Sequence, residues 1–185
     1  MNSTTSRYRC HAFRFAFLVA VCSLFAATTA RAATLSLVPL TGEFHCGNTW
    51  TIDVVLDEAT TDLRGFSLVF EYDNSIITPQ SVNAGGLITA AACPNFLSWV
   101  GPASSTSLQV DIANLGCSAS GPGTILSIVF KGQSSGASTI GIRGGQLRDG
   151  ANVPIAFTSN VVTVNYDCAV PVDGASWGGL KATYR

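Results

Sequence analysis

The feature that most constrains the fold is a two-residue alternation between large apolar side chains and small or weakly polar ones. In "LRGFSLVFEYDNSIITPQSV", residues 63–82, large apolar groups fall on every second position: Phe66, Leu68, Phe70 and Tyr72. The intervening positions carry a flatter set: Leu63, Gly65, Ser67, Val69 and Glu71. Successive side chains of a β-strand point to opposite faces, so the first set predicts a core face. The second set is a separate surface that needs its own explanation.

Short alternating runs of this kind continue along most of the chain and are separated by Gly, Pro, Asn, Asp and Ser. The predicted strands cover residues 35–40, 49–58, 63–73, 77–83, 96–101, 107–114, 124–132, 138–143 and 160–166. No long segment with a 3.6-residue period interrupts them. Short strands with regular turn signals predict an all-β fold, a nine-stranded antiparallel β-sandwich of the jelly-roll kind.

The first 32 residues have the composition of a secretory signal peptide. Arg7, Arg9 and Arg14 provide a positive start, residues 15–27 form a short apolar run, and "ARA" at 30–32 supplies the small residues needed for cleavage before Ala33. The apolar run is too short to span a membrane. We therefore expect a secreted protein, extracellular or at the cell surface. Its mature domain would cover residues 33–168, followed by a linker and short tail over 169–185.

Cleavage at this point changes the charge of the chain. Six basic residues would remain against eleven acidic ones, which gives a formal net charge of −5. This balance argues against nucleic acid or an anionic membrane surface as a partner. No second apolar segment follows that would suggest a transmembrane span.

The four cysteines of the mature chain predict two disulfides, because an even number of cysteines in an exported protein is typical of disulfide bonding. If residues 96–101 and 107–114 form a hairpin, matching Val100 with Val110 makes the paired residue numbers sum to 210. Cys93 and Cys117 have the same sum, so we predict that they close the base of this hairpin. Cys46 and Cys168 then pair by elimination.

The predicted register also assigns the faces of the hairpin. With Val100 and Val110 inside, the outward residues would be Leu97, Trp99, Gln109, Asp111 and Ala113. Trp99 would then lie opposite Asp111, and an outward Trp beside Asp and Gln suits the binding of a sugar or a protein. The alternative is that a loop or the tail covers Trp99.

Signals for catalysis or metal binding are weak. His45 stands beside Cys46, but a disulfide would remove the thiol as a ligand or nucleophile, and the mature chain has no second histidine. Asp53 and Asp57 fall on the outer face of one predicted strand, and no pattern places a carboxylate pair in a cleft. "RDGANVP", residues 148–154, is interpreted as a turn, with a weak calcium site left open. We expect no enzyme activity and no cofactor.

In the order and spacing of its strands, the segment from Leu35 to Tyr166 resembles a cohesin, the module of cellulosomal scaffoldins that binds dockerins. The resemblance lies in "LSLVPLTGEFHCGNTWTIDVVL", in "LRGFSLVFEYDNSIITPQSV" and in "GTILSIVFKG". It implies a nine-stranded jelly-roll sandwich shared with several carbohydrate-binding modules. It further implies a non-catalytic partner-binding role, with a dockerin-like protein module or a polysaccharide as ligand and a link to polysaccharide catabolism.

In the cohesin family, one sheet face built from the third, fifth, sixth and eighth strands captures the dockerin. The resemblance assigns that face to Gly65, Ser67, Val69, Leu97, Trp99, Gln109, Asp111 and Arg143. One departure is that scaffoldin cohesins often carry Asn and Asp on the third strand, where this chain has Gly65 and Ser67. The four cysteines are also unusual for the family.

The end of the chain suggests a second hypothesis of a different class. In "WGGLKATYR", Trp177, Leu180 and Tyr184 recur at helical spacing, although two glycines weaken a helix there. These residues form a candidate recognition element. Under this alternative, the protein is a structural or surface-display protein attached to the cell envelope through its C-terminal tail.

Overall fold

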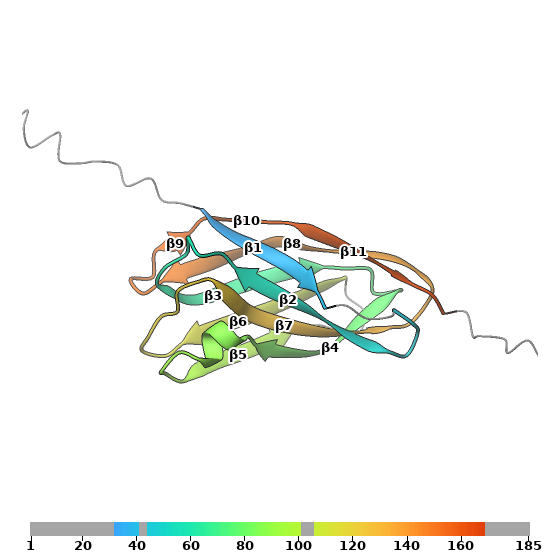
Figure 1. Ribbon diagram of the computed structural model, residues 1–185, viewed down its shortest axis with the longest axis horizontal. Coiled ribbons are helices and arrows are strands. Elements are labelled where there is room, and N and C mark those ends of the chain that lie inside the picture. The colour runs from blue at the N-terminus through green and yellow to red at the C-terminus, as the bar shows by residue number, and fades with distance from the viewer. Residues whose placement is uncertain (1–31, 41–43, 101–105, 169–185) are drawn as a thin grey trace, which may run out of the picture. The chain divides into compact units, whose positions relative to one another are not determined.

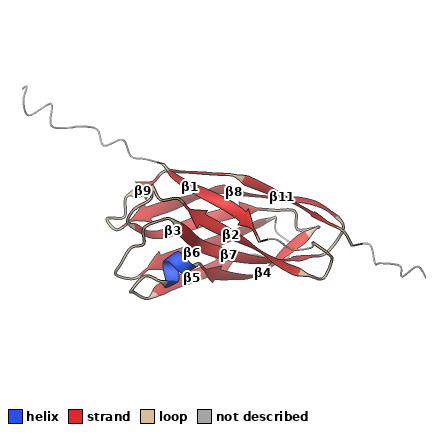
Figure 2. Ribbon diagram, viewed as in Figure 1, coloured by secondary structure: helices blue, strands red, loops and turns tan. Residues whose placement is uncertain are grey.

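A computed structural model describes residues 32–40, 44–100 and 106–168 of the chain. The expected signal peptide therefore lies almost wholly outside the described residues, as does the tail with Trp177, Leu180 and Tyr184. The described part is built of strands with one helical turn (Figures 1 and 2). None of its helices is long and apolar enough to cross a membrane.

Two sheets pack face to face. The first has the order β10 (Phe157–Ser159), β1 (Ala33–Pro39), β2 (Thr49–Leu56), β7 (Gly123–Gly132) and β4 (Ile77–Ala84). The second has the order β11 (Val161–Tyr166), β8 (Gly136–Asp149), β3 (Leu63–Glu71), β6 (Ser107–Asn114) and β5 (Asn95–Val100), and β9 (Pro154–Ile155) pairs with β8. The predicted all-β sandwich is confirmed.

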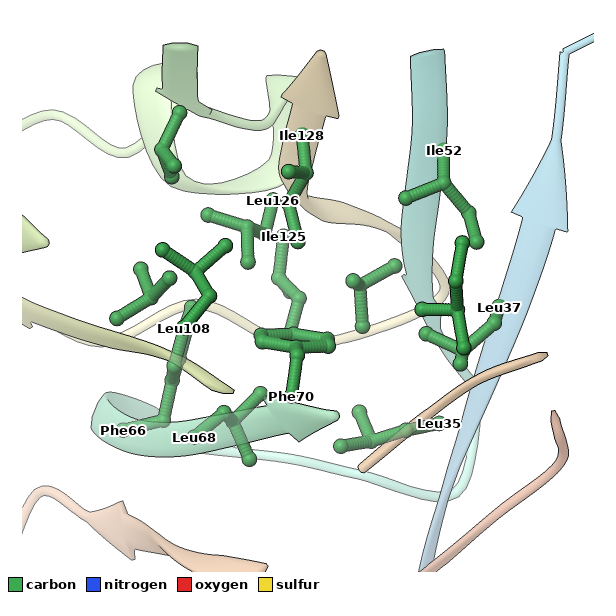
Figure 3. Packing of buried hydrophobic residues seen from close by; sticks show 14 of the residues in the cluster. Leu35, Leu37, Ile52, Phe66, Leu68, Phe70, Leu108, Ile125, Leu126 and Ile128 are labelled. Atoms are coloured by element: carbon green, nitrogen blue, oxygen red, sulfur yellow. The ribbon is translucent and has the colours of Figure 1, made fainter. Parts of the chain in front are cut away.

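The inner faces of the two sheets form one apolar core. The alternation predicted for β3 is observed from Gly65 onward, because Phe66, Leu68 and Phe70 are buried while the residues between them are not. Leu63 was predicted on the outer face but is buried, since the register shift between Leu63 and Gly65 places Arg64 in a bulge and changes the alternation. Phe70 of β3 points toward Ile125 and Leu126 of β7 (Figure 3). These two neighbours are both buried because a bulge in the β2–β7 pairing interrupts the alternation there.

Several elements differ from the sequence-based expectation. The last predicted strand, residues 160–166, corresponds to β11, which pairs with β8. The short strands β9 and β10 before it were not predicted, and β10 pairs with β1 in parallel in the other sheet, so the described residues form eleven strands rather than nine. β8 extends to Asp149, six residues beyond its predicted end, and a bulge at Arg143 breaks its simple alternation. A single helical turn, α2 (Gly86–Thr89), was not predicted because four residues carry no periodic signal.

Both predicted disulfides are present. Cys93 is bonded to Cys117, and Cys46 is bonded to Cys168, the last described residue. Beside the second disulfide, residues from the beginning and the end of the domain's sequence meet. His45 forms a β-bridge with Asp167, and the ring of Phe44 packs against those of Trp50 and Tyr166. The domain is thus cross-linked at this end and along the edge hairpin.

Candidate functional site

The outer face of β8, β3, β6 and β5 is the candidate functional site, and we call it the platform. Its members follow from the strand register and from the exposure of alternate residues. They are Gly65, Ser67, Val69 and Glu71 on β3, Gln109, Asp111 and Ala113 on β6, Phe96, Ser98 and Val100 on β5, and Arg143, Gln146 and Arg148 on β8. The flat face recognised in the sequence of β3 is the middle of this surface.

The predicted register of the β5–β6 hairpin was wrong by one residue. Trp99 pairs with Val110 and Leu97 pairs with Ile112, so paired numbers sum to 209 rather than 210. A shift of one residue moves every side chain of a strand to the opposite face. Leu97 and Trp99 therefore share the inward side of Val110, and Trp99 does not lie opposite Asp111.

The chain geometry between the hairpin and its disulfide explains this error. The ladder ends at Asn95 and Asn114, after which Leu115 N still donates to the Pro94 carbonyl. Gly116 then adopts a φ of +101°, which turns the chain before Cys117. The disulfide therefore lies outside the ladder, and its residue numbers do not report the register.

The corrected register places different residues of β5 on the platform. Phe96 and Val100 point outward and are 58% and 63% exposed, respectively, with Ser98 between them opposite Asp111. Leu97 is half-buried against the core, and Trp99 is 36% exposed at the edge of the sheet. The alternation of Phe96, Ser98 and Val100 was visible in the sequence but was assigned to the inner face.

The other six residues assigned from the sequence do lie on the platform. Two side-chain contacts order them: Gln109 Nε2 donates to both Asp111 oxygens at 3.2 and 3.3 Å, and Arg143 Nη1 lies 3.0 Å from Glu71 Oε1. Both Arg143 and Glu71 are exposed, so this ion pair contributes at most about 1 kcal/mol to the free energy of folding. The two pairs are better suited to holding polar groups in place than to stabilising the fold.

A hollow of about 370 Å³ opens across β8, β3 and β6 of the platform, near the beginning of β3. Its lining comes from β3, β6, β8 and the turn after β8, and comprises Arg64, Gly65, Phe66, Ser67, Ile112, Ala113, Asn114, Leu115, Gln146, Arg148, Asp149 and Asn152. Gly65 is required here, because a Cβ at this position would lie 2.7 Å from the Ile112 carbonyl oxygen. The residues Gln146, Arg148 and Asn152 were missed from the sequence because β8 was predicted to end at residue 143.

Several carboxylates of the described residues make structural contacts. Asp53 Oδ1 accepts from Ser127 Oγ at 2.6 Å, on the sheet opposite the platform. Asp57 accepts from Thr60 Oγ1 and Thr34 N, and although burial opposes its ionisation, these hydrogen bonds lower its pKa overall. Asp149 is the single carboxylate lining the hollow, whereas hydrolysis of a glycosidic bond normally uses two.

The turn predicted within 148–154 occupies residues 150–153, between the end of β8 and the beginning of β9. Asp149 Oδ1 accepts the backbone N–H groups of Ala151 and Val153 at 2.9 and 2.7 Å, so this oxygen closes the turn. Within the described ranges, no group of three or more His, Cys, Asp or Glu side chains is arranged to hold a metal ion.

The two packed sheets and the open outer face of one of them define the structural class of this chain, which is a jelly-roll β-sandwich module. Comparison with known proteins identifies the fold more closely. No protein-family model matches the sequence, and no curated protein does. The second type II cohesin of the ScaA scaffoldin of Acetivibrio cellulolyticus matches with a TM-score of 0.64 and 13% identity, over 80% of this chain and 98% of that one.

Two further cohesins show the range of settings in which this fold occurs. The sixth cohesin of scaffoldin B from the same organism, solved in complex with a Cel5 dockerin mutant, matches with a TM-score of 0.60 and 16% identity, over 74% of this chain and 100% of that one. A non-cellulosomal cohesin from Archaeoglobus fulgidus matches with a TM-score of 0.58 and 15% identity, over 74% and 92%. The chain has the cohesin fold.

Proposed function

We propose that this protein is a secreted, non-catalytic module that binds a dockerin-like protein partner through the platform. The observation that carries the proposal is the outer face of β5, where Phe96 and Val100 are largely exposed beside a polar surface on β3 and β8. Exposed apolar side chains within a polar rim are typical of protein-binding surfaces. The cohesin solved with a bound dockerin supports the same role for this fold.

The disulfides support an extracellular location for the module. Two bonds that close long loops are stable in an oxidising environment and rare in the cytosol. Together with the signal-peptide composition of residues 1–32, they favour export. The cohesin from Archaeoglobus fulgidus is described as non-cellulosomal, so the fold itself does not require a cellulosome.

A protein partner is favoured over direct binding to a polysaccharide. Stacking on sugar rings needs exposed aromatic faces, and Phe96 is the single exposed aromatic residue that the structure describes on the platform. Trp99, which suggested sugar binding, lies on the inward side of β5. Any role in polysaccharide catabolism would then come through the partner.

The partner is expected to differ from a standard dockerin at the β3 contact. Gly65 and Ser67 stand where scaffoldin cohesins often carry Asn and Asp, and the close approach of β6 excludes a larger side chain at position 65. A complementary surface must therefore fill the space above Gly65 with its own side chain.

Binding of purified dockerins to the immobilised mature protein tests the proposal. At least one dockerin from a broad panel should bind, and Phe96→Ala and Val100→Ser should each weaken that binding at least tenfold. Val38→Ser is the matched control, because Val38 is an exposed valine on β1 of the opposite sheet. Binding that is equally sensitive to Val38→Ser, or no binding across the panel, would contradict the proposal.

A further inference from the structure

The positive charges of the described residues are concentrated on the β3–β8 side of the platform. Four cations occur in these residues against nine acidic side chains, and three of the four belong to the β3–β8 region: Arg64, Arg143 and Arg148. The fourth, Lys131, lies on β7 of the opposite sheet. A domain with an excess of acidic groups thus presents a basic region on its candidate binding face.

Two of these arginines have no carboxylate partner among the residues that the structure describes. Arg143 pairs with Glu71, but neither Arg64 nor Arg148 forms an ion pair within the described part of the chain. Neutral oxygens hold them instead. Arg64 Nη1 donates to the Gly150 carbonyl at 3.1 Å, and Arg148 donates to the Asn152 carbonyl at 2.9 Å and to Gln146 Oε1 at 2.6 Å.

These hydrogen bonds fix the guanidinium groups without neutralising them. Arginine presents five N–H donors, so each group keeps donors available for a further acceptor. A carboxylate that meets an already oriented arginine loses less conformational entropy on binding, and the bidentate pair is directional. Both arginines line the hollow whose lining also includes Gly65 and Ala113.

The acidic groups around the hollow are engaged by the chain itself. Asp149 Oδ1 accepts two backbone N–H groups of its own turn, and Asp62 Oδ2 accepts Gly150 N at 3.1 Å. The hollow also contains Ser67 and Asn152, which can add neutral hydrogen bonds. The hollow therefore combines the remaining arginine donors with the buried side-chain amide of Asn114, whose Nδ2 donor and Oδ1 acceptor both lack a partner among the described residues.

We propose that the hollow is a carboxylate-binding subsite that receives an aspartate or glutamate side chain of the protein partner. This inference rests on the proposed function, because the partner reaches the hollow by lying across the platform. Its apolar side chains would contact Phe96 and Val100 on β5, and its acidic side chain would enter between Arg64 and Arg148 on the β3–β8 side. The expected partner is thus an acidic, amphipathic surface of complementary charge.

The subsite can be tested on the whole mature protein without a partner. The probe is N-acetyl-glutamate N-methylamide, and its uncharged control is the corresponding glutamine compound. In two-dimensional NMR titrations to about 100 mM, an expected weak-binding range, the glutamate probe should shift the Gly65, Ala113 and Gln146 amides in a saturable manner. Arg148→Gln should remove the shifts, and Lys131→Gln should leave them unchanged.

The other outcomes are decisive as well. Equal shifts with the glutamine probe, or shifts that persist in Arg148→Gln, would overturn the proposal. If a uronic-acid oligosaccharide binds the hollow at least tenfold more tightly than the glutamate probe, the proposal of a protein carboxylate is overturned. The ligand would then be an acidic glycan. If the glutamate probe binds as expected while no dockerin binds, the proposed function fails and the anion subsite remains.

Discussion

The side-chain amide of Asn160 forms two hydrogen bonds with the backbone of Leu37. Asn160 Oδ1 accepts the Leu37 N–H at 2.6 Å, and Asn160 Nδ2 donates to the Leu37 carbonyl at 3.1 Å. Asn160 lies between β10, which pairs with β1, and β11, which pairs with the other sheet. The side chain thus continues the hydrogen bonding of β1 beyond the point where the main chain departs from it.

Replacing Asn160 with alanine should destabilise the domain by about 1–3 kcal/mol, because two partly buried backbone groups lose their partners. Asn160→Asp should also be destabilising, since a carboxylate oxygen would face the Leu37 carbonyl in place of a donor. Chemical denaturation measures both changes. Asn165→Ala, at an exposed position of β11, is the control and should change stability by less than about 0.5 kcal/mol.

Tyr166 should make the domain sensitive to alkaline pH. Burial raises the pKa of Tyr166 to about 12, and its hydroxyl has no hydrogen-bond partner in the described structure. The unfolded chain ionises near pH 10, so stability should fall as the pH rises from about 10 through about 12, by roughly 2–3 kcal/mol. Tyr166→Phe should keep or raise stability at pH 7 and should lack this part of the alkaline loss.

Thermal denaturation of both proteins between pH 7 and 12 measures the effect. Tyr72 also has a raised pKa from burial, so the wild-type protein alone would not isolate Tyr166, whereas the difference between the two curves does. A difference that stays constant with pH would contradict the prediction.

Gly132→Ala is a separate test of packing and should be strongly destabilising, since a Cβ there would collide with the Tyr166 ring.

Asp57 should contribute to acid sensitivity. Burial disfavours its charged form, but the hydrogen bonds from Thr60 and Thr34 outweigh this effect and lower its pKa. Its stabilisation is therefore present above the unfolded-state pKa of about 3.9 and is lost as the pH falls through the lower folded-state value. The stability difference between wild type and Asp57→Asn should shrink from pH 7 to pH 3. Glu58→Gln, an exposed neighbour, is the control.

The two disulfides should differ in their contribution to stability. Their cysteines are separated by 24 residues for Cys93–Cys117 and by 122 residues for Cys46–Cys168. In the loop-entropy model these separations correspond to about 3.5 and nearly 5 kcal/mol, so the Cys46→Ala/Cys168→Ala variant should be the less stable one. Non-reducing peptide mapping should recover both pairs, and a reversed order of stabilities would show that strain or residual structure outweighs loop entropy.

Deletion of residues 170–185 should leave the fold intact. Every described strand and both disulfides lie before residue 169. We expect the melting temperature to change by about one or two degrees. Retention at the cell surface is the second measurement, because its loss on deletion would support attachment through Trp177, Leu180 and Tyr184. A large loss of stability would instead make these residues part of the fold.

The sequence was most informative where a strand has one buried and one open face. The alternation of β3 predicted the core face and the middle of the platform, because a period of two leaves one assignment compatible with a single core. It was least informative for β5, an edge strand with few buried residues, where Val100 and Leu97 were equally apolar choices for the inside. The turn at Gly116 places the Cys93–Cys117 disulfide outside the ladder. The residue numbers of the two cysteines therefore could not serve as an independent check on the register of the hairpin.

The hollow could not be predicted from the sequence, for a different reason. It depends on bulges that reset β8 against β3 and on a turn that brings Asn152 beside Arg148. Bulges change which residues share a face, and the sequence of β8 contains several glycines that allow them without locating them. Arg148 and Gln146 could be placed on the platform once the register of β8 was known.

The Cys46–Cys168 bond also determines how far the domain can be stretched. It encloses the chain from β2 to β11, so a pulling force that enters before β1 and leaves after residue 168 passes through the sulfur bridge. The 122-residue separation corresponds to roughly 400–440 Å of fully extended chain, and this length is released only after the bond is reduced. In an oxidising environment, such a force could therefore extend only β1 and the other residues before Cys46, and reduction would convert the domain into a long tether.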